Sequence, residues 1–194
     1  MITSNIKKSE KKLELFFGIK TPKYRFVYLK SREEIDRLKG YKTENWVCGF
    51  TIGKTIYILH PEVIEKTSTC KVAEISSLFK HELAHIFYVE IARGEDRPLW
   101  LNEGLALHLG EQDMQRVDRI PLQKIEHYFD SADEELYYYS FSLVKYLINV
   151  YGKNKIIQLL KSIEPSITKK SFPKVVQRIY GKPLNRIIAD YTKK

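Results

Sequence analysis

The sequence has few of the features that mark membrane-spanning or disulfide-rich proteins. No stretch approaches the roughly 18 uninterrupted apolar residues that a membrane-spanning helix requires, because charged residues make up 29% of the 194 residues. The only two cysteines are Cys48 and Cys70. Two cysteines are too few for a disulfide scaffold, so we expect buried or inert thiols. The composition therefore predicts a soluble protein.

The first twelve residues lack the apolar core of a secretory signal peptide. They are polar and rich in lysine, whereas a signal peptide has an apolar stretch behind its positively charged end. We therefore expect a cytoplasmic protein by default. Internal repeats and low-complexity linkers are missing too, and 43% of the residues are hydrophobic. A chain of this length predicts one compact domain over residues 1–194, with residues 1–45 as its less defined N-terminal part.

The net charge of +9 is unevenly distributed along the chain. Lys and Arg exceed Asp and Glu by 6 in residues 1–40 and by 9 in residues 153–194, whereas acidic residues are in excess by 6 in residues 41–152. Nucleic-acid-binding modules usually carry their basic cluster on the element that reads the ligand. Here the positive charge lies in flanking segments. We therefore favour solvated helix faces and expect no specific nucleic acid, with an anionic surface bound by the basic termini as the alternative.

Hydrophobic patterns predict strands in the first third of the chain and helices after it. We expect a short helix that ends near Gly18, a strand over residues 24–29, a helix over 31–40, and a hairpin made of 46–50 and 55–59. Apolar spacings of three and four predict helices over 71–91, 98–109, 138–150, 155–163, 173–180 and 184–191, with a polar, mixed stretch over 111–135. This order predicts an α+β fold with a small mixed N-terminal sheet and a mostly helical C-terminal half.

Two histidines stand four positions apart in the helix expected over residues 71–91. His81 and His85 would project from one face about one turn apart, so both imidazoles can reach one ion. Catalytic zinc sites usually have three protein ligands and leave a fourth position for water. Glu82 points aside from the ligand face, so it can accept a proton from that water as a general base.

The third ligand should come from a separate element, and Glu103 in the next predicted helix is the candidate. The 17 residues between His85 and Glu103 allow the first helix to end and a second helix to begin. Gly104 would let the two backbones approach closely, and Asn102 could hydrogen-bond a metal ligand. Two imidazoles and a carboxylate suit Zn²⁺ best among the common ions.

A motif of three fixed residues also arises by chance, in which case His81 and Glu82 would be solvated helix residues. Glu103, of a suitable type in a suitable predicted helix, favours the metal site over this alternative. The remaining histidines are more typical of surface or core positions than of ligands. They are His60, His108 and His127.

The segments 81–85, HELAH, and 100–106, WLNEGLA, resemble the two metal-binding motifs of gluzincin zinc metallopeptidases almost position for position. The likeness is to compact bacterial peptidase-like domains related to the aminopeptidase and leukotriene-hydrolase branch, and it covers residues 46–191. It implies a zincin-like metallopeptidase domain with the metal site between the sheet and the helical half. It also implies zinc held by the two histidines and Glu103, and a peptide or protein substrate.

The resemblance extends to a tyrosine-rich segment. Residues 137–147 are similar to a segment of the family in which a tyrosine is followed three positions later by a small residue and then by an apolar helix. This alignment implies that Tyr137 is the catalytic tyrosine. Tyr138 and Tyr139 stay open as alternatives, because a shift of one residue changes the choice.

Two departures from the family pattern qualify the implied activity. Aminopeptidases of this branch have an acidic residue in the edge-strand motif, where it holds the free amine of the substrate, and residues 47–51 contain none. The resemblance therefore implies an endopeptidase rather than an aminopeptidase, with an edge strand within residues 47–59 beside the substrate backbone. Some gluzincins also carry an aspartate four positions after the glutamate ligand to orient a histidine. Position 107 is leucine, so another residue, a carbonyl or water would have to serve.

The central motifs thus favour a zinc-dependent hydrolase, and two other functions stay open. In the hydrolase, Glu82 would be the general base and the Tyr137 hydroxyl would face the negative charge that develops on the substrate oxygen. A zinc-binding interaction or sensor domain without peptidase activity would bind the metal and cleave nothing. A binder of nucleic acid or anionic surfaces would lose affinity steeply with salt and would keep that affinity without His81.

Overall fold

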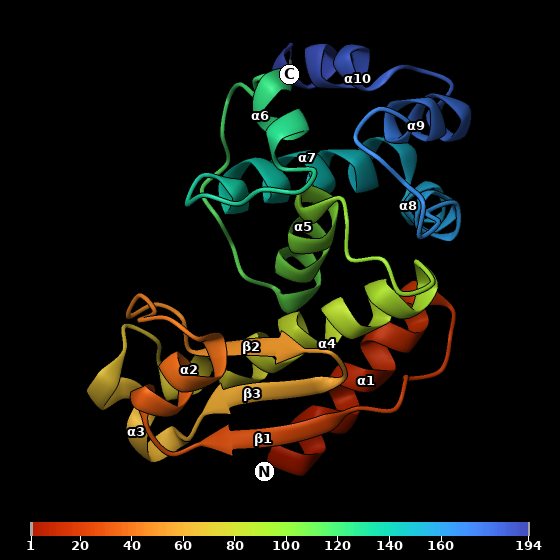
Figure 1. Cartoon of the computed structure of the whole chain (residues 1–194). Coiled ribbons are helices and arrows are strands. Elements are labelled where there is room, and N and C mark those ends of the chain that lie inside the picture. Colours follow the sequence, from red (N-terminus) through yellow and green to blue (C-terminus); the bar gives the residue numbers. More distant parts are fainter. Residues whose placement is uncertain (1, 194) are drawn as a thin grey trace. The chain divides into compact units, whose positions relative to one another are not determined.

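The computed structural model describes residues 2–193, which form a mixed α+β fold (Figure 1). The chain divides into two compact units, an N-terminal unit up to Ile86 and a C-terminal unit from Phe87. The boundary falls inside one helix, α4 (Ile75–Ile91). The α+β class predicted from the sequence is therefore confirmed, while the single zincin-like domain stays a prediction.

The N-terminal unit combines a three-stranded sheet with helices. Its elements are α1 (Ile2–Phe17), β1 (Arg25–Leu29), α2 (Arg32–Lys39), β2 (Gly49–Ile52), β3 (Thr55–Leu59), α3 (Pro61–Thr67), the 3₁₀ turn η1 (Val72–Glu74) and the first part of α4. The strand order is β1-β3-β2, with β1 parallel and β2 antiparallel to β3. The predicted mixed sheet and hairpin are confirmed, although the first hairpin strand begins at Gly49 and not at residue 46, and α3 was not predicted.

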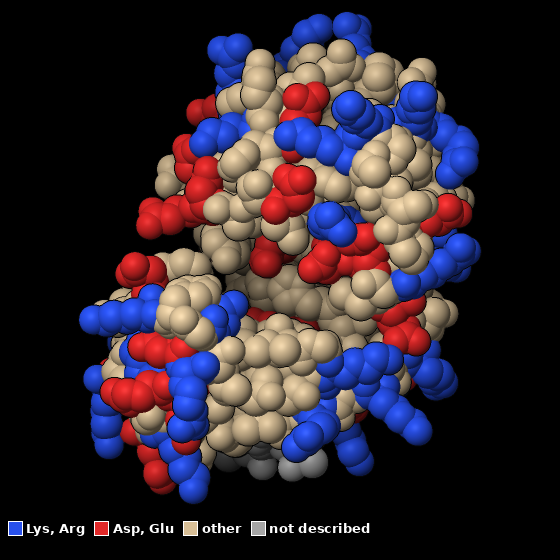
Figure 2. Space-filling model, viewed as in Figure 1, with Lys and Arg blue, Asp and Glu red and all other residues tan. Residues whose placement is uncertain are grey.

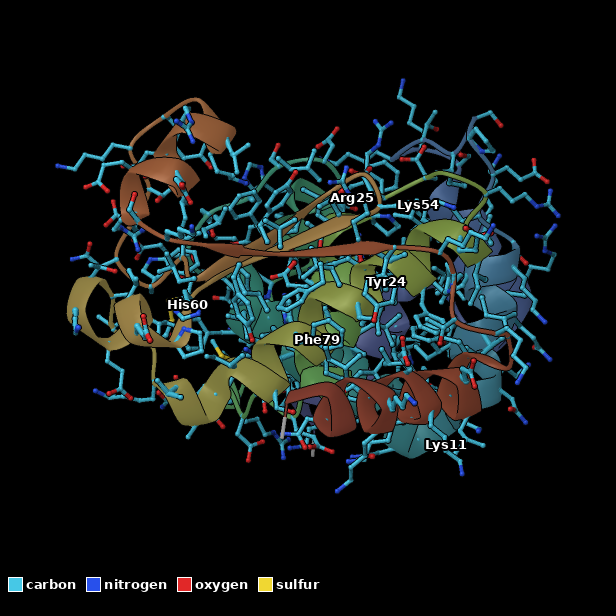
Figure 3. The ribbon with its side chains drawn as sticks, turned by 90° about the horizontal axis from the view of Figure 1, so that it is seen from below. Lys11, Tyr24, Arg25, Lys54, His60 and Phe79 are labelled. Carbon is cyan, nitrogen blue, oxygen red and sulfur yellow. A yellow bond between two sulfur atoms is a disulfide. The ribbon has the colours of Figure 1, made fainter. Side chains whose placement is uncertain are left out.

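One face of this sheet packs against α4. Ile56 of β3 is completely buried, and the ring of Phe26 in β1 lies 5.4 Å from the ring of Phe79 in α4. Tyr24, just before β1, extends the same contact, with its ring 6.0 Å from that of Phe79 (Figure 3). Its hydroxyl donates a hydrogen bond of 2.8 Å to Glu10 of α1. Aromatic contacts thus fix α4, the helix that carries the histidine pair, under the strands.

A disulfide joins Cys48, directly before β2, to Cys70, two residues before η1. The two Cα atoms lie 6.5 Å apart, within the usual range of about 4.4–6.8 Å for a disulfide. The expectation of two inert thiols was therefore wrong. The cysteines are 22 residues apart in sequence. They meet because the hairpin and α3, which was not predicted, bring the chain back to Cys48.

In the described part of the C-terminal unit, the secondary-structure elements are all helices. Besides the end of α4 it contains α5 (Leu99–Gly110), α6 (Leu122–His127), α7 (Leu136–Tyr151), α8 (Lys153–Lys161), α9 (Phe172–Tyr180) and α10 (Leu184–Thr192). Five of these helices were predicted, and their ends agree to within two residues. The sixth, α6, is a helix of six residues that buries Ile125, and it lies in the stretch predicted to be polar and mixed.

No helix within residues 2–193 is long and apolar enough to cross a membrane. Lysine and arginine side chains crowd around α9 and α10 on the face shown in Figure 2. They belong to the basic segment over residues 153–194. An anionic surface as their partner stays a prediction.

Candidate metal centre

The two histidines of the HELAH segment face each other on α4. The Nε2 atoms of His81 and His85 lie 3.1 Å apart, and their ring planes are inclined at 81°. Two ligands of a tetrahedral zinc ion, each roughly 2.0–2.1 Å from it, are about 3.3 Å apart. The two nitrogen atoms therefore have nearly the separation that a shared ion needs.

Glu103 of α5 completes the group that the sequence predicts. One ligand atom from each of His81, His85 and Glu103 lies within 4.8 Å of the other two, so the three side chains are close enough to hold a metal ion. His81 is buried, and the other two residues are half-buried. Two imidazoles and one carboxylate are a donor set that fits zinc, the ion predicted from the sequence.

The start of α5 is fixed by backbone carbonyls instead of a capping side chain. Its N-cap is Pro98, which has no side-chain acceptor. The N–H groups of Leu99 and Trp100 donate to the carbonyl oxygens of Phe129 and Tyr128, at 3.1 and 3.0 Å. These bonds satisfy donors that the first turn of a helix otherwise leaves without a partner. They anchor the helix one turn before Glu103.

The loop before α5 is held by a set of polar contacts. The buried carboxylate of Glu95 accepts hydrogen bonds from the backbone N–H and the Nε of Arg97, at 3.2 and 2.9 Å. Burial raises the pKa of Glu95, but the hydrogen bonds and charge of Arg97 outweigh it and leave the pKa below its usual value. Tyr88 donates to the carbonyl of Arg97, and Asn102 donates to the carbonyl of Asp96, both at 3.0 Å. Asn102 thus ties α5 to this loop, a role that the sequence did not predict.

Gly104 lies where α5 and α7 come closest. A Cβ atom built on Gly104 would be 2.4 Å from the carbonyl oxygen of Ser140 and 2.5 Å from Cγ2 of Val144, closer than real Cβ atoms approach. The sequence predicted that Gly104 would let α5 approach the helix of the histidine pair, but the close approach seen at Gly104 is to another helix. The backbone that it approaches is that of α7, a partner that the sequence did not identify.

Tyr137 shares the face of α7 that meets α5. Along a helix, positions three and seven residues apart lie on one side, so Tyr137 lies on the same side as Ser140 and Val144. These are the two residues that surround Gly104. Tyr137 is also half-buried. It therefore lies one turn from the contact that fixes the helix of Glu103.

The two neighbouring tyrosines have other surroundings. The side chain of Tyr138 is 40% exposed, and the ring of Tyr139 stacks on Tyr128 with centroids 6.2 Å apart. The choice among the three tyrosines stays a prediction.

Glu82 is 4% exposed and accepts a hydrogen bond from the edge strand β2. Oγ1 of Thr51 lies 2.9 Å from Oε2 of Glu82 and 3.2 Å from its main-chain oxygen. A hydroxyl has one proton to donate, and the shorter distance and the negative charge favour the carboxylate. The sequence did not indicate this role of Thr51, because the pattern of a strand does not show which residue of a helix lies opposite it.

Strand β2 runs beside α4 in a definite register. A Cβ atom on Gly49 would lie 3.1 Å from Cδ2 of Leu78, and two residues further along the strand Thr51 meets Glu82. Two residues of a strand advance about 6.8 Å and four residues of a helix about 6 Å, so the two contacts match. Among residues 2–193, β2 pairs with β3 on one side and with no strand on the other. This edge strand therefore lies next to the helix of the histidine pair.

No protein-family model, curated protein or solved structure matches the chain. The resemblance to gluzincins therefore stays a prediction that rests on the two motifs. What the site does has to be inferred from its residues.

Proposed function

We propose that this protein is a zinc-dependent hydrolase, a metallopeptidase of the gluzincin type that cleaves internal peptide bonds. The observation that carries the proposal is the grouping of His81, His85 and Glu103 within 4.8 Å. A second observation supports catalysis over simple metal storage. The buried carboxylate of Glu82 stands beside the first ligand and is held by a hydrogen bond from the edge strand.

Each residue of the group has a distinct role in this proposal. The two histidines and Glu103 hold the ion, which when bound would polarise a substrate carbonyl and lower the pKa of a water molecule to about 7. Glu82 would accept a proton from the water molecule that adds to the carbonyl carbon, and would return it to the amine nitrogen as the C–N bond breaks. The hydroxyl of Tyr137 donates to the substrate oxygen as negative charge develops on it.

The edge of β2 is the proposed docking position for the substrate backbone. An extended peptide can add to an open sheet edge through main-chain hydrogen bonds, which recognise peptides of many sequences. A peptide paired with β2 would run past Thr51, whose side chain contacts Glu82. Residues 47–51 provide no carboxylate for a free amino terminus, which favours cleavage within a chain.

Metal content and peptide cleavage, measured together, test this function. We expect about one zinc per chain in the wild type and in Glu82→Gln, and loss of zinc in His81→Ala. His127→Ala, at an exposed position in α6, is the matched control and should keep its zinc. On a library of internally quenched peptides, the wild type and His127→Ala should be active. Glu82→Gln should lose at least about 100-fold in rate, because its proton acceptor is gone.

The outcomes separate the alternatives. Cleavage that is unchanged in Glu82→Gln would remove Glu82 from the mechanism, and zinc retained by His81→Ala would remove this site. Zinc bound by the wild type with no peptide of the library cleaved would favour the non-catalytic interaction or sensor domain.

A further inference from the structure

We infer that Thr51 is a positioning residue for Glu82, holding its carboxylate in the orientation that proton transfer requires. The inference rests on the proposed hydrolase function. It starts from the 2.9 Å hydrogen bond between Oγ1 of Thr51 and Oε2 of Glu82, which joins residues 31 positions apart in sequence. Thr51 donates to one carboxylate oxygen, and we assign proton transfer to the other.

The donor is fixed by the strand that carries it. Thr51 pairs with Ile56 across the antiparallel ladder of β2 and β3, so its backbone is held by the sheet. A β-branched side chain has few χ1 rotamers, so the hydroxyl has little freedom once the backbone is fixed. Glu82, by contrast, has three side-chain torsions to order. A rigid donor is therefore well suited to select one orientation of this carboxylate.

The strand register explains why a threonine stands at this position. Side chains of a strand alternate between its two faces, and Gly49 and Thr51 both point towards α4, the first at Leu78 and the second at Glu82. At Gly49 a Cβ atom would lie 3.1 Å from Leu78 of the helix and 3.1 Å from Ile58 of β3, so the space is tight. At Thr51 there is room for a short polar group that reaches a carboxylate. The edge proposed to pair with the substrate is thus connected directly to the general base.

Substitution of the hydroxyl alone tests the inference. Thr51→Val keeps a β-branched shape and removes the donor, whereas Thr51→Ser keeps the donor. With zinc-loaded protein and the best-cleaved peptide of the library, we expect Thr51→Val to lower kcat about 10- to 100-fold, with KM changed less than about 2-fold. Thr51→Ser should stay within about 3-fold of the wild type. Thr55→Val is the matched control, since Thr55 lies on the same hairpin opposite Ile52, on the other face of the sheet.

A structural readout accompanies the kinetics. In crystals of zinc-loaded Thr51→Val the Glu82 carboxylate should turn away from its wild-type orientation, while in Thr51→Ser it should not. Zinc content should be equal in all of these variants, because Thr51 is not a ligand. If Thr51→Val does not fold, Thr51→Ala removes the hydroxyl without placing a new methyl group in its position.

The results distinguish the inference from the function on which it rests. A wild type that binds zinc and cleaves no peptide contradicts both. An active wild type whose kcat and Glu82 orientation are unchanged in Thr51→Val overturns the role of Thr51 and leaves the hydrolase standing. A loss of kcat that Thr51→Ser does not rescue, or one that Thr55→Val shares, would show a general effect of the strand and would also overturn it.

Discussion

The two units of the molecule secure their candidate functional residues by different means. In the N-terminal unit Glu82 is held by a hydroxyl from β2, and the start of that strand is joined by a disulfide to the segment before η1. In the C-terminal unit Glu103 belongs to a helix fixed by close backbone packing at Gly104. Polar bonds set orientation and can be removed singly, whereas close packing admits no additional atom. We therefore expect single substitutions around Glu82 in the N-terminal unit to reduce activity, and single substitutions around Gly104 in the C-terminal unit to reduce stability.

Gly104→Ala should have the largest effect on stability. Alanine in place of glycine usually favours a helix by about 1 kcal/mol. Here the new Cβ would lie 2.4 Å from a backbone oxygen, so we expect the free energy of unfolding to fall by about 4 kcal/mol, beyond the usual cost of overpacking. Gly49→Ala in β2 is the comparison, with its nearest contacts at 3.1 Å, and should cost about 1 kcal/mol. If urea denaturation showed the same loss of unfolding free energy in Gly104→Ala and Gly49→Ala, the contrast between the units would be contradicted.

Loss of the disulfide should follow in size. The bond closes a loop of 22 residues, and the chain-entropy account predicts a stabilisation of about 3 kcal/mol for such a loop. Denaturant unfolding with and without a thiol reductant would measure it. The double variant Cys48→Ser with Cys70→Ser is the control, and its midpoint should not respond to reductant. An identical midpoint for oxidised and reduced wild type would show that this bond does not stabilise the N-terminal unit.

A smaller, pH-dependent effect is expected at Glu95, where the C-terminal unit does use polar contacts. Because the pKa of Glu95 is lowered from 4.5 in the folded state, its contribution is present above about pH 4.5. It is lost as the pH falls through the lowered value. Glu95→Gln should therefore be less stable than the wild type by about 1 kcal/mol at pH 7, and the difference should shrink in acid. Glu126→Gln, at an exposed position, should show no such trend. A difference that is constant with pH would contradict the assignment.

Local patterns predicted those parts of the site that lie within single helices. Spacing of four residues placed His81 and His85 on one face, and the residue type and predicted helix identified Glu103, which the structure brings to the same group. The partner of Gly104 could not be predicted, because nothing local to α5 identifies α7 as the helix it meets. Thr51 was missed for the same reason. Alternation along a strand separates its faces but does not show which side chain of a helix lies opposite.

The disulfide was missed because pairing depends on how the chain returns, not on how many cysteines it has. The structure also bears on the compartment predicted by default. Disulfides persist mainly in oxidising environments, and the bond between Cys48 and Cys70 is more typical of such a compartment. The cytoplasmic location itself stays an untested prediction.

Anomalous X-ray diffraction at the zinc absorption edge, from crystals grown with one equivalent of Zn²⁺, tests the central claim most directly. We predict a single strong peak at roughly 2.0–2.2 Å from the facing nitrogen atoms of His81 and His85 and from a carboxylate oxygen of Glu103. Crystals of His81→Ala should lack it. Crystals that contain zinc but show no anomalous peak at these three side chains would contradict the proposed metal centre and the function built on it.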